Sequence, residues 1–385
     1  MNNTTNPSDR LDPAKLLAST AHRLTLHARL TPTAERDRFQ PAGFPEVGHV
    51  IYDSPRGDGS TRKVCIVDSA ASMANHLETV CHQSHFGLDL HPDLNGLPHV
   101  QCVTDDDKGG RTRLVVTTLS EGHRLASSLF TDAKSKIEAP EAIKGKNLNE
   151  VLLHDEFKLE NLGKRTHPLP ADWWNVFRAV FKFDPNSLVH GILFPAMGIK
   201  IPRALTAQLD AFGAARVASS GVKFDKLLMT TSGQPIFAKD EETAQEIRAT
   251  FVIDLALIRS FGRGTDGLTD PQKQFLVAFS LWKIAQLLQH PFRFRSGCDL
   301  EFVDLVIDGD SENPVKSLPK IDIKDYIKNA GFAENHDHRI TKVYWKKDEI
   351  FKVARDAKKT DEKEGGDQAA DETASNDDDS NDQED

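Results

Sequence analysis

The sequence lacks the features that mark several common classes of protein. It has only four cysteines, Cys65, Cys81, Cys102 and Cys298, and no two of them have the C-x-x-C spacing. Neither a zinc ribbon nor a redox dithiol is therefore indicated, and we expect plain reduced thiols. No segment approaches the roughly 18 apolar residues of a membrane span, and residues 1–10 lack the pattern of a signal peptide. We expect a cytoplasmic protein with no membrane partner.

Motifs of nucleotide-dependent enzymes and of hydrolases are also missing. There is no G-x-S-x-G elbow and no P-loop. Residues 262–267 match G-x-G-x-x-G, but no acid occurs between Asp270 and Asp299 to bind a ribose. Two interpretations of this segment remain open: a tight turn, or a glycine-rich loop whose backbone approaches a phosphodiester chain. We expect no cofactor.

Charge is distributed unevenly along the 385 residues. The net charge is −10, but residues 361–385 alone carry twelve acids and one base, which leaves the rest of the chain at +1. Residues 158–226 contain ten bases and five acids, interspersed with aromatic and amide side chains. Cations for phosphates and flat groups for bases are what single-stranded RNA recognition needs. The acidic pI therefore does not exclude a nucleic-acid partner.

Hydrophobic periodicity predicts a mixed α+β fold with an antiparallel sheet. Alternation predicts a strand at residues 23–30, and Asp68 and Ser69 precede helical spacing that includes Met73 and Leu77, with Glu78 on the opposite, polar face. A further helix is expected to begin at Asp172, and another at Pro271 with Asp270 as its cap. Additional strands are predicted at residues 64–67, 100–103, 114–117, 247–258 and 300–307.

The chain is interpreted as three parts. Residues 1–20 are interpreted as an N-terminal extension, residues 21–355 as one domain with insertions, and residues 356–385 as a disordered acidic tail. Within the domain, residues 133–170 are charged and weakly periodic, which indicates an insertion or a flexible arm.

Two short groups of polar residues could carry chemistry. Residues 121–124 bring together Glu121, His123 and Arg124, as a ribonuclease-like site would need; contact with RNA and a structural ion pair are equally open readings. The histidines between residues 76 and 99 are irregularly spaced, and residues 336–338 (HDH) lie in an unpatterned charged segment. We therefore expect no metal site.

Five blocks of the sequence, in the same order, resemble one known family. They are RFQPAGFP (38–45), SAASMANHLE (69–78), EGHRLAS (121–127), FDPNSLVHG (183–191) and IPRAL (201–205). The chain is similar here to the RAMP-superfamily backbone subunit of the type I-G (formerly I-U) CRISPR effector complex. The similarity continues through residues 254–259 to residues 298–301 and spans about residues 20–305.

The resemblance implies a modified RNA-recognition-motif (ferredoxin-like) RAMP fold with large insertions. It implies a subunit without enzymatic activity that polymerises along a guide RNA and presents it for pairing in antiviral defence. The implied partners are the CRISPR guide RNA, further copies of the chain, the large subunit, the guide-capping or processing subunit, and target DNA. The residues expected to contact RNA are Arg38, Gln40, Ser72, Asn75, His123, Arg124, Asn186, His190, Arg203, Arg259 and Arg263. No catalytic and no metal-binding residue is expected.

Two other classes of function remain open. The first is a RAMP ribonuclease that cuts bound target RNA with a metal and a loop aspartate, for which Asp37, Asp53 and Asp58 are candidates. The second is a small-molecule enzyme on an α/β fold, which the missing motifs disfavour. Co-purification of a discrete small RNA would argue against the second class, and an intact target RNA in the presence of magnesium would argue against the first.

Overall fold

The structure of the protein is a computed structural model. The structure describes residues 10–44, 48–84, 87–106, 108–159, 161–162, 165–166, 168–217, 241–318, 320–332 and 339–350. The predicted acidic tail at residues 356–385, most of residues 1–10 and the HDH segment at residues 336–338 lie outside the described residues.

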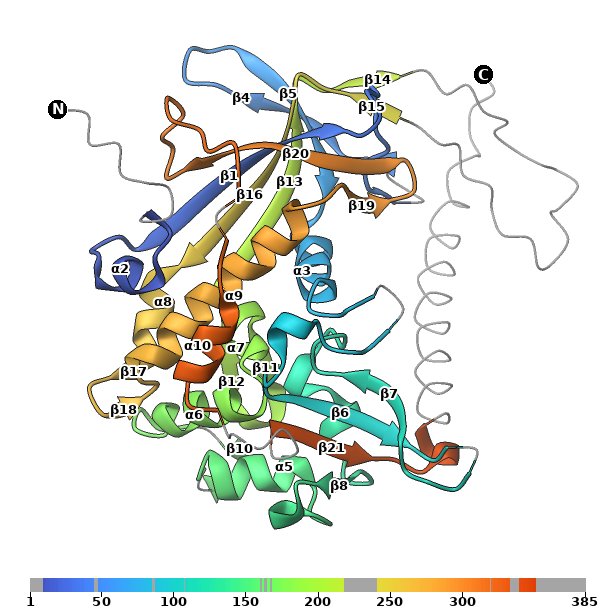
Figure 1. Ribbon diagram of the computed structural model, residues 1–385, viewed down its shortest axis with the longest axis vertical. Helices are drawn as coiled ribbons and strands as arrows, with labels where there is room; N and C mark the ends of the chain where they lie inside the picture. Colours follow the sequence, from blue (N-terminus) through green and yellow to red (C-terminus); the bar gives the residue numbers. More distant parts are fainter. Residues whose placement is uncertain are drawn as a thin grey trace, which may run out of the picture.

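A seven-stranded sheet forms the upper half of the molecule in Figure 1, and all of its strand pairs are antiparallel. Its order is β19-β20-β1-β16-β13-β5-β4. The strands are β1 (Arg23–Pro32), β4 (Ile51–Pro55), β5 (Thr61–Asp68), β13 (Leu205–Phe212), β16 (Glu246–Asp254), β19 (Phe292–Arg295) and β20 (Cys298–Ile307).

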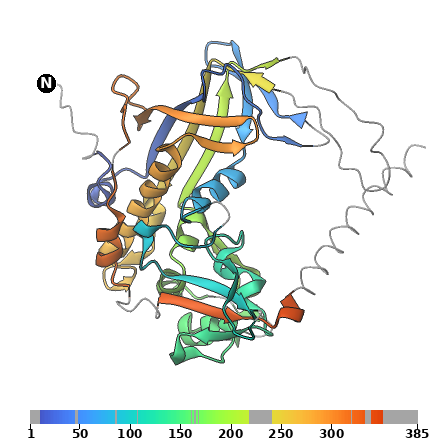
Figure 2. The same ribbon diagram turned by 45° about the vertical axis from the view of Figure 1, so that its right-hand side comes forward.

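The centre of this sheet has the ferredoxin-like topology. Along the chain, β1 is followed by helix α3 (Ala70–Thr79), β13, β16, helix α9 (Asp270–Leu288) and β20, and in space these strands have the order β20-β1-β16-β13. This is the split β-α-β-β-α-β arrangement. Both helices lie against the same face of the sheet (Figures 1 and 2). The predicted fold class is therefore confirmed.

Local sequence explains how these elements form. In β1, Leu24, Leu26 and Leu30 alternate with more exposed residues, so one face of the strand packs under the helices. The Ser69 side chain accepts a hydrogen bond from the Ser72 backbone N–H and caps α3, as predicted. Helix α9 begins one residue earlier than expected, because Thr269 and Gln272 form a capping box.

The predicted strand at residues 247–258 is wrong for its last four residues. The chain leaves the sheet after Asp254, whose side chain accepts a hydrogen bond from the Leu257 backbone N–H and starts helix α8 (Leu255–Ser260). The sequence pattern does not show this change from strand to helix, because short apolar runs occur in both buried strands and buried helices.

A second, four-stranded sheet lies at the opposite end of the molecule (Figure 1). The strands predicted at residues 100–103 and 114–117 belong to it rather than to the main sheet. Its order is β7-β6-β21-β8, and the chain's last described strand, β21, lies parallel to β6. The strands are β6 (His99–Thr104), β7 (Arg113–Thr117), β8 (Lys136–Ala139) and β21 (Ile340–Tyr344).

The segment expected to be an insertion or a flexible arm is packed where the structure describes it. Strand β8 is an edge strand of the second sheet, helix α5 (Leu148–Glu150) contacts α4 (Ser128–Thr131), and the π-helix η4 (Val151–Glu156) contacts α6 (Trp173–Phe183). Ile137 and Leu148 are completely buried. Its few apolar residues anchor the described part of the segment, and its role as an insertion or arm stays a prediction.

The remaining elements are shorter. They are the helices α2 (Pro13–Ala18), α4 (Ser128–Thr131), α6 (Trp173–Phe183), α7 (Asn186–His190) and α10 (Ile323–Asn329), the 3-10 turns η1 (Pro92–Leu94), η2 (Arg124–Ala126), η3 (Glu141–Ile143) and η5 (Pro195–Met197), and the strand pairs β2 (Gly43–Phe44) with β3 (Gly48–His49), β9 (Asn161–Leu162) with β10 (Arg165–Thr166), β11 (Ile192–Phe194) with β12 (Ile199–Ile201), β14 (Ala215–Val217) with β15 (Glu241–Thr243) and β17 (Gly262–Arg263) with β18 (Asp266–Gly267). None of the described helices has the length and apolar character to cross a membrane. All four cysteines are buried and unpaired, as expected, and burial raises the pKa of Cys65 to about 12.

Candidate nucleic-acid interface

Three of the sequence blocks meet at one groove. The loop after β7, the turn after α7 and the β11–β12 hairpin line a hollow of about 580 Å³. Its polar lining includes His123, Arg124, His190 and Arg203, all of which the sequence predicted to contact RNA. Lys200, Ser127 and Ser128 add a cation and two hydroxyl groups. The groove therefore offers the donors that bind phosphate oxygens.

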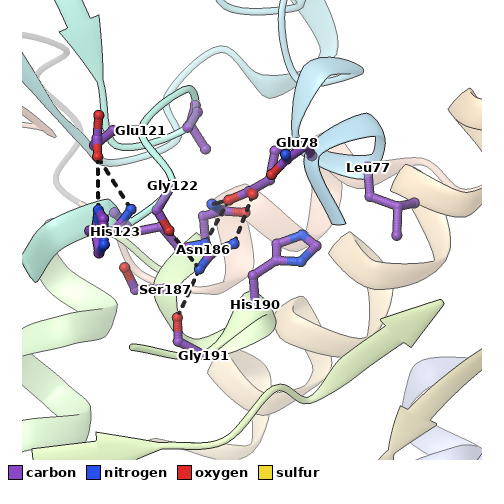
Figure 3. A network of polar contacts seen from close by, with 12 residues as sticks. Leu77, Glu78, Glu121, Gly122, His123, Asn186, Ser187, His190 and Gly191 are labelled. Carbon is purple, nitrogen blue, oxygen red and sulfur yellow. Dashed lines mark hydrogen bonds and ion pairs between the residues drawn. The ribbon is translucent and has the colours of Figure 1, made fainter. Parts of the chain in front are cut away.

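Arg124 bonds to Glu78, Gly122 and Gly191, three of the residues labelled in Figure 3. Its Nε and Nη2 donate to the two carboxylate oxygens of Glu78 on α3, at 2.7 and 2.8 Å, and both side chains are buried. Nη1 also donates to the carbonyls of Gly122 and Gly191, each at 3.3 Å. Arg124 has a φ of +54°, an uncommon conformation for a residue with a side chain. The bidentate ion pair holds the loop in this shape.

Behind Arg124 lies a buried polar network that reaches α9. Lys283 is completely buried, and its Nζ donates to Asn186 Oδ1 and to His190 Nε2, the latter at 2.9 Å. Asn186 Nδ2 donates to Glu78 Oε1 at 2.7 Å. Because an ammonium group can only donate, His190 Nε2 must accept and its proton must be on Nδ1. Burial and the nearby Lys283 hold the pKa of His190 well below its ordinary value, so the ring is neutral.

Asp184 makes the stability of this network depend on pH. Burial, together with the nearby Glu78, raises its pKa to about 7, and its carboxyl group accepts from Ser187. The native state therefore holds a proton that the unfolded chain releases above its ordinary pKa, so this stability is complete at acid pH and is lost as the pH rises to about 7. Asp184→Asn should remove this dependence. In urea titrations, we expect its free energy of unfolding to gain on wild type by up to about 1.4 kcal/mol per pH unit between about pH 4 and 7. A difference that does not change with pH would contradict the assignment.

Gly191 allows the hairpin to approach the network. Its φ is +81°, and a Cβ there would lie 2.9 Å from the carbonyl oxygen of Ile201 and 3.1 Å from the backbone nitrogen of Arg203. Only glycine avoids both the strain and the clash. The close approach places Arg203 at the groove, where its Nη1 donates to the Ala70 carbonyl at 3.4 Å.

The outer part of the groove is exposed. The side chain of His123 is 85% exposed and its Nδ1 lies 3.3 Å from Glu121 Oε1. On the other side of Gly122, a smaller hollow of about 290 Å³ is lined by Asn75, His82 and other residues of α3 and the loop. Asn75 thus lies beside the groove, and its contact with RNA remains a prediction. His82 and Glu78, which the helical pattern placed on a polar face, are both buried.

Four of the remaining predicted residues bond to other parts of the protein. Ser72 Oγ donates to Asp68 Oδ2 at 2.9 Å, and Arg38 Nε donates to Glu241 at 2.8 Å. The backbone N–H of Gln40 donates to the Gly297 carbonyl at 2.8 Å. Arg259 donates to the carbonyls at the end of α2, including that of Leu17 at 2.9 Å. Their contacts with RNA remain predictions.

The eleventh residue, Arg263, lies in the glycine-rich segment. That segment forms the two-stranded β17–β18 hairpin. A Cβ on Gly262 would lie 1.9 Å from the Leu268 carbonyl oxygen, so the glycine is needed for a close backbone approach. This geometry supports the tight-turn interpretation.

The candidate residues for a metal-dependent ribonuclease are scattered in the structure. Asp37 contacts Arg38 at 3.4 Å, and Asp53 contacts Lys63 at 3.5 Å. Asp58 accepts from Ser60. Within the described part of the chain, no three or more His, Cys, Asp or Glu side chains come together in a way that could hold a metal ion.

A known protein family matches the part of the chain that contains the three sequence blocks lining the groove. Residues 24–216, just over half of the chain, match the family described as CRISPR-associated protein GSU0053. The chain belongs to this family. The matched region begins in β1, ends in β14 and contains His123, Arg124, His190 and Arg203.

Among solved structures, one match is described as a CRISPR RNA-guided surveillance complex, pre-nicking. It is 14% identical, covers 74% of this chain and 75% of that chain, and has a TM-score of 0.35. The family is therefore assigned from the sequence match over residues 24–216 alone. The chain has no match among the curated proteins.

Proposed function

We propose that this chain is an RNA-binding backbone subunit of a CRISPR surveillance complex. In this proposal, the groove around residues 120–124 holds the sugar–phosphate backbone of the guide RNA. The partners are further copies of the chain, the other subunits of the complex and target DNA. The subunit acts by binding rather than by catalysis.

The convergence of separate sequence blocks at one groove carries this proposal. Residues from about positions 123, 190 and 203 line a single hollow, and the buried Arg124–Glu78 pair fixes its shape. The exposed groups are His123, Lys200 and Arg203, which suit phosphate oxygens but provide no set of side chains for proton transfer. A backbone subunit that coats many different guides needs contacts of this sequence-independent kind.

Removing two cations from the groove tests the proposal. We expect Lys200→Ala with Arg203→Ala to weaken binding of a labelled single-stranded RNA by about tenfold at low salt. The slope of log affinity against log salt should become shallower by about 1.4, because each lost phosphate contact in a single strand contributes about 0.7. Fluorescence anisotropy across a salt series measures both quantities.

The matched control removes the same charge elsewhere. Lys324 and Lys328 are exposed on α10, away from the groove, so Lys324→Ala with Lys328→Ala should leave the salt slope nearly unchanged. Equal effects of the two double variants would show that only net charge matters and would remove the groove from the proposal.

A further inference from the structure

Two cations at the groove are not balanced by the described part of the chain. Lys200 and Arg203 are exposed, and neither makes an ion pair with a carboxylate of the described residues. Arg203 instead donates a hydrogen bond to the Ala70 carbonyl. By contrast, the exposed Arg293 on β19 pairs with Asp299 at 2.6 Å. The groove therefore presents positive charge that an acidic partner can neutralise.

The chain carries its excess of negative charge in one segment. Residues 361–385, called the acidic segment below, contain twelve acids and one base, a net charge of −11, whereas the rest of the chain has a net charge of +1. The acidic segment has no aromatic residue, and its only aliphatic side chains are three alanines. Carboxylates bind guanidinium and ammonium groups as phosphate oxygens do. The acidic segment is thus a polyanion with the same kind of ligand atoms as a nucleic-acid backbone.

The acidic segment is joined to the chain beside the groove. Strand β21 lies next to β6 (Figure 1), and Trp345, which follows β21, donates from Nε1 to the Leu129 carbonyl at 2.7 Å. Leu129 directly follows Ser128, which lines the groove. The last described residue is Ile350, and ten residues separate it from the acidic segment. Ten extended residues span up to about 35 Å, so the link is long enough for a return to the groove.

We propose that the acidic segment binds in the groove of the free chain, with its carboxylates on Lys200 and Arg203, and that guide RNA displaces it. The effect on RNA rests on the proposed function of the groove, whereas the binding of the acidic segment does not. A segment linked to its site has an effective concentration of about 1 mM, so a dissociation constant of about 0.1 mM for the segment lowers the affinity for a short RNA about tenfold. A guide held by several copies of the chain makes enough contacts to displace the segment from each.

The first test detects the contact in the unaltered full chain. A carbodiimide joins a carboxylate to a lysine amine where the two are in contact, and mass spectrometry of the monomer identifies the joined peptides. We expect Lys200 to be joined to the acidic segment. Products confined to Lys352, Lys358 and Lys359, which precede the acidic segment, would assign the acids to that basic stretch and overturn the proposal.

Added single-stranded RNA should abolish the Lys200 product. If the product persisted at saturating RNA, the acidic segment would still bind the groove, but its displacement by RNA would be refuted, and the proposed function with it. If the product were absent while Lys200→Ala with Arg203→Ala still weakened RNA binding, the proposed function would stand and the present proposal would fail. The two failures are therefore distinguishable.

The second test measures the effect on RNA affinity. In the full chain, the twelve acids of the acidic segment are replaced by asparagine and glutamine, and the probe is a fluorescein-labelled single strand of about 12 nucleotides. We expect binding to become about tenfold tighter at low salt, and the gain to disappear at high salt. With Lys200→Ala and Arg203→Ala also present, the gain should be much smaller, because the acids have already lost their partners.

The matched background is Lys324→Ala with Lys328→Ala, which removes the same charge from α10 and should keep the tenfold gain. An equal gain in all three backgrounds would show that the acids act only through net charge. That result, or no gain in the otherwise unaltered chain, would overturn the proposal.

Discussion

Replacing Glu78 with alanine is expected to lower the free energy of unfolding by about 3–5 kcal/mol. The reason is that Glu78 is the only carboxylate among the described residues that lies within hydrogen-bond distance of the buried Arg124. Glu78 also accepts a hydrogen bond from Asn186. Its loss leaves a buried guanidinium and a buried amide without their acceptor, close to the buried cation of Lys283. Urea unfolding followed by circular dichroism measures this effect.

Two controls show whether the buried charge causes the loss. Glu121→Ala removes a carboxylate whose partner, His123, is exposed, and should cost no more than about 1 kcal/mol. Replacing both Glu78 and Arg124 with methionine should cost less than the sum of the single changes, because neither charge is then left alone. A loss below about 1 kcal/mol for Glu78→Ala would mean that water enters the network and replaces the carboxylate.

Sequence patterns predicted most of the elements that local interactions determine. The alternation in β1 and the cap of α3 depend on neighbouring residues, and both are confirmed. The ferredoxin-like order of the main sheet came from the family resemblance instead, since strand order depends on contacts between distant segments. The sequence analysis did not predict the groove, because a sequence block shows which residues it contains but not which other blocks lie beside it in the fold.

Buried charge was the main feature that sequence reasoning missed. Glu78 follows Ser72 and Asn75 at helical spacing, which indicates an exposed face, and only the packing of the loop and α7 against α3 buries it. Lys283 gave one usable signal, a single cation inside the long apolar helix α9. A lysine in that position needs buried acceptors. The sequence does not show that Asn186 and His190 supply them.

The sequence also did not predict the pairing of the last described strand, β21. Strand β21 is only five residues long and includes the exposed Lys342, so its pattern is weak. It nevertheless lies between β6 and β8, which are far away in the sequence. Pairing across such a separation depends on the backbone hydrogen bonds of both neighbours and on the anchor that follows the strand, Trp345.

Replacing Trp345 with alanine should therefore destabilise the second sheet strongly. Trp345 is 1% exposed, and its Nε1 donates to the Leu129 carbonyl at 2.7 Å. Its backbone N–H donates to Val103, and its carbonyl accepts from Thr104. Removing a large buried aromatic side chain costs about 3–5 kcal/mol. Urea unfolding followed by far-ultraviolet circular dichroism measures this loss.

The effect should extend to RNA binding, because the loop that carries His123 and Arg124 follows β7 of the same sheet. Near the denaturation midpoint of the variant, its affinity for labelled RNA should fall together with the folded fraction. Trp345→Phe keeps most of the buried volume and loses one hydrogen bond, so it should cost about 1–2 kcal/mol. Lys342→Ala, exposed on the same strand, should change stability by no more than about 0.5 kcal/mol. If Trp345→Ala were as mild as Lys342→Ala, β21 would not be what holds β6 and β8 together.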